Sequence, residues 1–284
     1  MRRAGPGRDR AQARDARLRV ALPLVVCIAG LLAWEAYVRL AAVPPYILPA
    51  PTLIAATLVT DRHILLASWL VTLETALLGL GLAVLGGVAL AVALSLSRIV
   101  EYAVYPLAVA LQVTPVVAVA PLLLIYLPES VAVLACAFVV AFFPILSNTM
   151  LGLQSVDRNL LELFALYGQP VGRSTAAARF RARAKALWHL RRPAALPSFL
   201  AGLRIAGGLS LIGAVVAEMA AGSAGASSGL AYRIIESQYR LNIPRLFAAL
   251  VLLITTGILI YLLTSAVSHR LLRRWHPSAL TPER

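Results

Sequence analysis

Six long apolar segments dominate the sequence, and they restrict the chain to a small set of folds. They cover approximately residues 20–40, 69–96, 103–126, 131–151, 198–221 and 246–267. Each is long enough to cross about 30 Å of hydrocarbon as an α-helix. Inside lipid the backbone must satisfy its own hydrogen bonds, so segments of this kind form helices. The sequence therefore predicts an all-α, polytopic membrane protein with six transmembrane helices.

Composition and charge narrow the classes of partner. Hydrophobic residues make up 60% of the 284 and charged residues only 13%, against about 25% charged in soluble domains. The formal charge is +14, but the basic residues lie in tails and connections and form no patch interleaved with aromatics. The cysteines lie in apolar runs and the histidines lack ligand spacing. We expect membrane lipid as the environment and no nucleic-acid partner, metal or cofactor.

The positive charges predict the orientation. Residues 1–19 form a basic tail that we expect to be unstructured, residues 20–268 form the transmembrane domain, and residues 269–284 form a second tail. An even number of spans places both tails on one side. Cytoplasmic segments carry an excess of Lys and Arg, so both termini are predicted to be cytoplasmic.

Polar residues inside the third and fifth spans are candidates for a translocation path. Gln112 and Thr114 precede Pro115 in the third span, and broken helices occur in membranes where the freed backbone faces protein or water. The alternative is a kinked packing helix in which Gln112 bonds to a neighbour. Arg204 and Glu218 in the fifth span are further candidates, with an internal pairing or an interface role as the alternative.

The connection between the fourth and fifth spans, residues 152–197, is long and rich in arginine. Asp157 or Asn159 is a suitable amino-terminal cap for a short helix, which Gly168 can end. Its apolar residues recur at helical spacing, at Leu160, Leu163, Phe164 and Tyr167. Such a stripe suits docking on another protein. A second helical piece around residues 187–190 is expected to end at Pro193 and Pro197.

Sequence motifs for covalent chemistry are absent. The chain contains no GxxxxGK[ST], GxSxG or HExxH motif, so we predict a transport subunit and not an enzyme. A membrane domain with a long docking loop is what a transporter needs when another polypeptide supplies the energy. The alternative is a secondary transporter or channel driven by an ion gradient, which would favour intramembrane carboxylates and internal repeats.

Several blocks of residues resemble one family. Residues 162–168 are similar to the "EAA" signature of permease subunits of ABC importers, with Glu162 and Gly168 in the expected places. Thr114-Pro115 and Ala120-Pro121-Leu122 resemble the branch that includes nitrate, sulfonate, taurine and thiamine-precursor permeases. Further matching blocks are residues 142–146, 193–197, 202–205 and 216–218.

The resemblance implies the function and the partners. It implies a type I ABC importer permease fold in the bacterial inner (plasma) membrane, assembled as a homodimer with two ABC ATPase subunits and supplied by an extracytoplasmic binding protein. Its cargo would be a small solute of the sulfonate, nitrate or vitamin-precursor type. The residues implied in coupling to the ATPase are Glu162, Leu163, Phe164, Ala165, Gly168 and Pro193.

The loop departs from the family pattern in its length. Pro193 follows Gly168 by 25 residues, about a dozen more than the family pattern has. We interpret residues 169–180 as an insertion, and Pro and Gly near its start favour a bulge over a longer rigid helix. The insertion leaves open how well the second half of the loop couples.

Overall fold

The computed structural model describes residues 6–168, 184–222 and 228–275, and every regular element in these ranges is helical. The predicted all-α class is confirmed. Five helices are long and apolar enough to cross a membrane, and a sixth span is counted if one bent pair is taken together. The insertion at residues 169–180 lies outside the described residues. The elements are α1 (Pro6–Leu40), α2 (Pro51–Thr60), α3 (Arg62–Leu96), α4 (Arg98–Val113), α5 (Val116–Tyr126), α6 (Glu129–Gln154), α7 (Arg158–Gly168), the π-helical turn η1 (Leu187–Arg191), α9 (Arg192–Ala221), α10 (Leu230–Tyr239) and α11 (Ile243–Trp275).

The chain forms two compact units, of which the smaller comprises residues 1–63 and 236–248. In this unit Glu35 of α1 holds the start of α2. Its carboxylate accepts hydrogen bonds from the backbone N–H of Thr52 at 3.1 Å and from the Thr52 hydroxyl at 2.8 Å. A carboxylate at this position satisfies a free N–H group and complements the positive end of the helix dipole. At the other end of α2, Asp61 pairs with Arg245 at 2.6 Å.

The amino-terminal tail differs from the expectation. Helix α1 begins at Pro6, so most of the segment predicted to be unstructured is helical. Pro6 is well placed, because the first turn of a helix does not use its N–H groups. The residues that follow are mainly Arg and Ala, which have high helix propensity. Net charge alone was therefore a poor guide to the structure of this segment.

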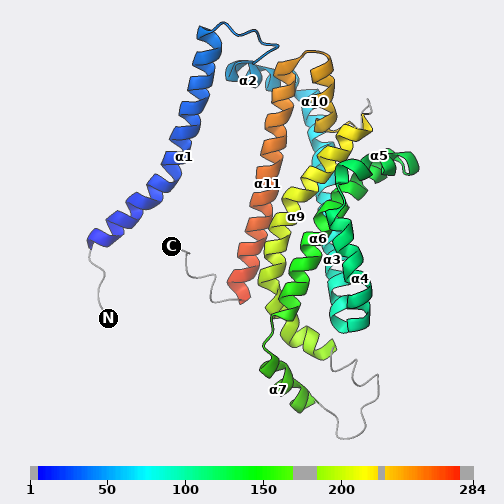
Figure 1. Cartoon of the computed structure of the whole chain (residues 1–284). Helices are drawn as coiled ribbons and strands as arrows, with labels where there is room; N and C mark the ends of the chain where they lie inside the picture. The colour runs from blue at the N-terminus through cyan, green and yellow to red at the C-terminus, as the bar shows by residue number, and fades with distance from the viewer. Residues whose placement is uncertain (1–5, 169–183, 223–227, 276–284) are drawn as a thin grey trace. The chain divides into compact units, whose positions relative to one another are not determined.

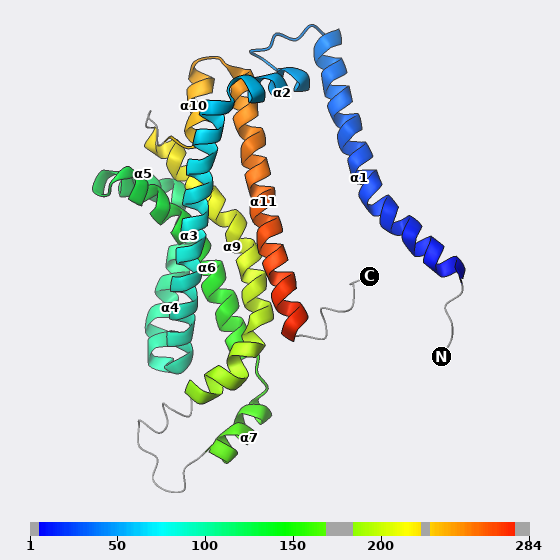
Figure 2. The same cartoon turned by 180° about the vertical axis from the view of Figure 1, so that it is seen from behind.

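The larger unit, residues 64–235 and 249–284, is a bundle in which α6 packs against both α3 and α9 (Figures 1 and 2). Glycines make both approaches close. A Cβ added at Gly213 of α9 would lie 2.6 Å from the carbonyl oxygen of Cys136, and one at Gly79 of α3 would lie 2.6 Å from the Cβ of Ala137. Small residues let helices associate tightly in lipid, where no hydrophobic effect drives them together. Helix α6 is therefore in close backbone contact with both α3 and α9.

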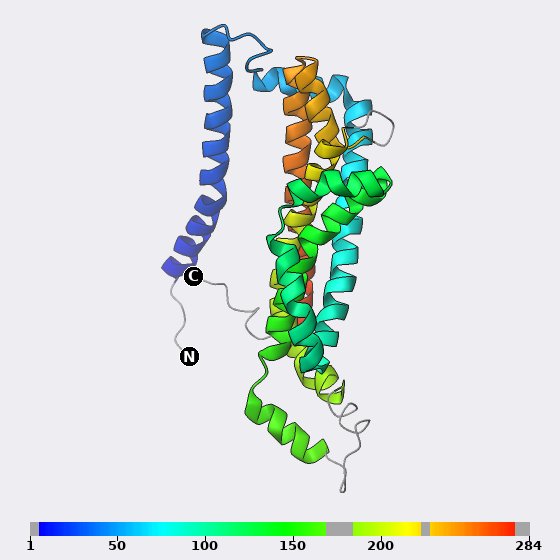
Figure 3. The same cartoon turned by 45° about the vertical axis from the view of Figure 1, so that its right-hand side comes forward.

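The third predicted span is broken. Helices α4 and α5 are bent by 100° at residues 114–115, and α5 runs across the bundle (Figure 3). Pro115 disfavours helical backbone at the preceding residue, and Thr114 is extended, with ψ 122°. Its hydroxyl donates to the carbonyl of Ala110 at 2.9 Å. Helix α5 buries Ala120 in a cluster with residues of α6 and α9.

The prediction that Pro193 and Pro197 end a helical piece is wrong. One continuous helical stretch runs from Ala184 to Ala221. It passes through the π turn η1 and then through α9, where Pro193 lies in the first turn. Proline is tolerated in a first turn, and the π turn just before Pro193 changes the hydrogen-bond pattern from i→i+4 to i→i+5. The helix that carries the fifth span therefore begins well before the expected residue 198.

The glycine contacts predict opposite effects of the same substitution in α9. We expect Gly213→Ala to lower the free energy of unfolding by about 1–3 kcal/mol, because the added methyl group overlaps α6 backbone. Gly208→Ala, where an added Cβ meets nothing within 4 Å, is the control and should be neutral or stabilising by up to about 1 kcal/mol. Denaturant titration in detergent micelles measures both, and equal effects would contradict the close α6–α9 contact.

Candidate functional site

Helix α7 is the first candidate for a functional element. Asp157 caps it, because its carboxylate accepts from the backbone N–H of Asn159 at 2.9 Å and its carbonyl accepts from Leu161 at 3.1 Å. Of the two predicted caps, Asp157 is the one used. The helix lies beyond the ends of α6 and α9, at one end of the bundle (Figure 1). It is therefore held at its start and extends away from the span that precedes it.

The faces of α7 differ in their surroundings. Leu160 and Leu163 are exposed, with 46% and 52% of their surface accessible. Phe164 is half-buried, and its ring centroid lies 6.4 Å from that of His189 in η1. The second half of the loop, in η1, therefore contacts the first half. The predicted apolar stripe is thus divided between an outward pair of leucines and an inward phenylalanine.

A cavity of about 780 Å³ separates α7 from the ends of the spans. We call it the α7 cavity. It is bounded by the end of α3, the start of α4, the end of α6, α7 and η1, and its lining residues are Ser95, Arg98, Glu101, Tyr102, Leu153, Gln154, Val156, Leu161, Glu162 and Arg191. Helices of alternating direction bring these distant segments together at one end. Any displacement of α7 changes the shape of this cavity.

The predicted coupling residues fall in different places around α7. Glu162 lines the α7 cavity, Leu163 faces outward and Phe164 packs on His189. Pro193 is exposed in the first turn of α9. Ala165 and Gly168 belong to α7, and the surroundings of both lie outside the described side chains.

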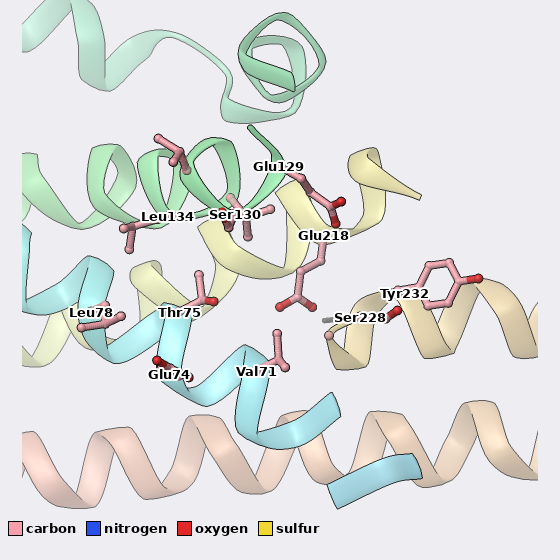
Figure 4. Close-up of a pocket in the computed structure, with 13 residues that line it drawn as sticks. Val71, Glu74, Thr75, Leu78, Glu129, Ser130, Leu134, Glu218, Ser228 and Tyr232 are labelled. Atoms are coloured by element: carbon pink, nitrogen blue, oxygen red, sulfur yellow. The ribbon is translucent and has the colours of Figure 1, made fainter. Parts of the chain in front are cut away.

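A second cavity, of about 590 Å³, lies at the opposite end of the bundle and is shown in Figure 4. We call it the Glu218 cavity. Its polar lining comes from α3, α6, α9 and the start of α10, and its charged groups are all carboxylates. The lining residues are Val71, Glu74, Thr75, Leu78, Glu129, Ser130, Val131, Val133, Leu134, Glu218, Ser228, Gly229 and Tyr232. No Lys, Arg or His is among these lining residues.

Glu218 is held by a buried network and is only 6% exposed. Its carboxylate accepts from the hydroxyl of Thr72 at 2.8 Å and from the backbone N–H of Ala231 at 3.1 Å. The same hydroxyl accepts from the backbone N–H of Leu230 at 2.8 Å. The carboxylate and hydroxyl thus satisfy two free N–H groups at the start of α10. The network ties α10 to both α3 and α9.

Gly229 completes this arrangement. A Cβ added there would overlap the carboxyl group of Glu218, so only glycine allows the chain to pass so close. Arg233 extends the attachment, because its Nε donates to the hydroxyl of Ser68 at 2.9 Å. For Glu218, these contacts support the alternative of an internal pairing.

The four predicted path residues are not gathered into one site. Glu218 lines the cavity described above, whereas Gln112 and Thr114 are exposed beside the α4–α5 break. Arg204 is half-buried in α9, and its Nε is buried with no hydrogen-bond partner in the described part of the chain. An arginine at the centre of a span costs about 2.5–3.5 kcal/mol in lipid, so this side chain needs protein or water around it.

Sequence reasoning missed Thr72 and the start of α10. A threonine inside an apolar run gives no signal, because Thr is compatible with a membrane helix whether or not its hydroxyl has a partner. Glu218 is recognisable in the sequence as a charge inside an apolar run, but its contact with residues 230–231 depends on the tertiary fold.

The network predicts a specific role for the Thr72 hydroxyl. Thr72→Val keeps the shape but leaves Glu218 and the N–H of Leu230 without this partner, so we expect the free energy of unfolding to fall by about 1–3 kcal/mol. The matched control is Thr255→Val, since that exposed hydroxyl bonds only to its own helix at Val251. Denaturant titration in micelles compares them. Equal stability of the two variants would contradict the network.

Comparison with known proteins assigns the chain to a family. Residues 83–274, more than half of the sequence, match the family described as "Binding-protein-dependent transport system inner membrane component". A probable ABC transporter permease protein of Haemophilus influenzae is 31% identical over 89% of this chain and 98% of its own. A formylaminopyrimidine transport permease protein of Halalkalibacterium halodurans is 34% identical, over 80% of this chain and 84% of its own. A riboflavin transport system permease protein of Chloroflexus aurantiacus is 32% identical, over 86% of each.

The family match confirms the resemblance carried by the separate sequence blocks. It implies ABC ATPase subunits and a binding protein as partners. The matched residues include α7, the whole lining of the α7 cavity and the α6, α9 and α10 parts of the Glu218 cavity, whereas the α3 wall of that cavity precedes them. The chain belongs to the binding-protein-dependent transport system inner membrane component family and is the non-catalytic, multi-pass inner-membrane permease of an ABC transporter.

Proposed function

We propose that α7 is the element through which ATPase subunits drive this permease, with Leu160 and Leu163 inserted into a groove of the ATPase. The observation that carries the proposal is the outward, exposed pair of leucines on a capped helix that lies beyond the spans. An amphipathic helix that presents an apolar stripe is a common form of groove binder. Glu162 lines the α7 cavity and Phe164 packs on His189, so these two side chains face the bundle. Ala165 and Gly168 belong to the same helix, and Pro193 lies in the first turn of α9.

Movement of α7 reaches two spans. The helix follows α6 along the chain, and its Phe164 contacts His189 in η1, which continues into α9. Closure of the ATPases on ATP then displaces α6 and α9 at one end of the bundle. Rocking of this kind exposes a central path alternately to the two sides of the membrane.

The path itself lies between two copies of the chain in this proposal, with both termini in the cytoplasm. The exposed Gln112 on a membrane-length element supports the second copy, because an amide side chain is unfavourable toward lipid. The arginines near both termini support the orientation. The binding protein then meets the side that carries the Glu218 cavity.

For the cargo, we favour an uncharged or cationic heterocycle over a sulfonate or nitrate. Glu74 lines the Glu218 cavity, whose lining residues include no Lys, Arg or His, and a carboxylate repels an anion that enters from this side. Two relatives above 30% identity carry names of heterocyclic solutes, formylaminopyrimidine and riboflavin. The cavity disfavours an anion, and the names of these relatives favour a heterocycle.

The docking proposal predicts the effect of a polar residue on the outer face of α7. Leu163→Gln should reduce copurification of the ATPase and lower binding-protein-stimulated ATP hydrolysis by at least about tenfold, the factor for a loss of about 1.4 kcal/mol. The control is Ile99→Gln, since Ile99 is 81% exposed near the same end but lies on α4. Uptake by proteoliposomes that lack the ATPase would favour the ion-gradient alternative and contradict the proposal.

The cargo proposal is tested with the complete transporter. We expect the binding protein loaded with an aminopyrimidine or flavin to stimulate ATP hydrolysis in proteoliposomes, and a thermal-shift screen of that binding protein to select the same class. Aliphatic sulfonates and nitrate are the comparison ligands. Stimulation by a sulfonate or by nitrate, with none by heterocycles, would contradict the assignment.

A further inference from the structure

Two arginines and two glutamates line the α7 cavity, and no ion pair joins any of them within the described chain. They are Arg98, Glu101, Glu162 and Arg191. They come from α4, α7 and the turn η1. Opposite charges that share one partly enclosed space attract each other more strongly than they do in bulk water.

Arg191 is the most constrained of the four. Its Nη1 donates to the carbonyl oxygen of Ser95, in the last turn of α3, at 3.3 Å. Its Nε is buried and has no hydrogen-bond partner among the residues that the structure describes. A buried guanidinium N–H without a partner is unfavourable. Arg191 is thus anchored at one nitrogen and retains an unused donor beside the cavity.

Glu162 is the acid suited to that donor. Glu101 already accepts a hydrogen bond from the side-chain amide of Gln154 at 3.1 Å, and it lies three residues after Arg98 on the same helix. Glu162 has no hydrogen bond or ion pair in the described structure, and it lies on the wall of the cavity formed by α7. If α7 moves toward the spans, Glu162 is the carboxylate that travels with it.

We propose that Arg191 is a positioning residue that receives the motion of α7, by pairing with Glu162 when the α7 cavity closes. This inference rests on the proposed function of α7 as the element driven by the ATPase. Arg191 immediately precedes α9 and already holds the end of α3. A pull on its guanidinium therefore acts on two helices that the chain does not connect directly to α7.

The pairing assigns two separate tasks to α7. Its exposed leucines contact the partner, whereas Glu162 communicates with the membrane domain of its own chain. The pair also compensates for the longer loop, because a direct contact from α7 to η1 bypasses residues 169–183. The motion of α7 is then transmitted to α9 by the Arg191–Glu162 pair more than by the chain that connects α7 to η1.

The test is a charge-swap cycle in the complete transporter with ATPase and binding protein in proteoliposomes. We expect Arg191→Gln and Glu162→Gln each to reduce the ratio of stimulated to basal ATP hydrolysis about fivefold or more, with the double variant no worse than either single one. Glu162→Arg combined with Arg191→Glu should restore at least about half of the wild-type ratio, as expected for a directly interacting pair.

The control is Arg192→Gln, one residue away. Arg192 lies 4.3 Å over the ring of Trp188 and does not line the cavity, so its loss should leave the ratio nearly unchanged. A purely structural tie between Arg191 and the Ser95 carbonyl predicts no rescue by the swap. Monodispersity in detergent is checked for every variant, and the exposed Glu162→Gln change keeps the test available if an Arg191 variant misfolds.

The outcomes separate this inference from the proposed function. Additive single effects and no rescue, in complexes that retain the ATPase and a normal wild-type ratio, would overturn the Arg191–Glu162 pairing and leave the docking role of α7 intact. Failure of the wild-type permease to copurify with its ATPase would instead overturn the proposed function.

Discussion

The contact between α6 and α9 is closer than any side chain at Gly213 or Gly202 would permit. A Cβ at Gly202 would lie 2.7 Å from the carbonyl oxygen of Pro144. In lipid, packing of this kind replaces the hydrophobic effect as the force that joins helices. The two helices also flank the loop that carries α7, since α6 leads into α7 and η1 leads into α9. Both ends of this loop therefore continue into helices that pack closely on each other.

The two ends of the bundle are built differently. At one end the Glu218 carboxylate, the Thr72 hydroxyl and the start of α10 form a satisfied, buried network. At the other end the α7 cavity holds charges that do not pair with one another. Regions with satisfied buried contacts open at a high free energy, and regions with few contacts deform readily. A displacement of α7 therefore deforms the end of the bundle that holds the α7 cavity. At the opposite end, the Glu218 network keeps α3, α9 and α10 together.

Much of this structure follows from the sequence, and the failures have physical causes. Length and hydropathy predict the helices, Thr114-Pro115 predicts the break, and Asp157 with its stripe predicts α7. The π turn could not be predicted in this way. Pro193 and Pro197 are ordinary helix-ending signals in the sequence, and only the structure shows that the π turn before them lets the helix continue. The Thr72–Glu218 network is also invisible in the sequence, since it joins segments about 150 residues apart. Local patterns determine the elements, whereas the polar contacts within the bundle require its three-dimensional packing.

Hydrogen–deuterium exchange of the permease alone and with its ATPase subunits, both in lipid nanodiscs, tests the central claim most directly. Exchange reports local opening along the whole chain, so it locates the partner without any substitution. Our account predicts that peptides covering Arg158–Gly168 and Leu187–Arg191 gain protection when the ATPase binds. It also predicts that peptides around the Glu218 network change little. Protection that spares α7 and appears at the Glu218 end would contradict the account.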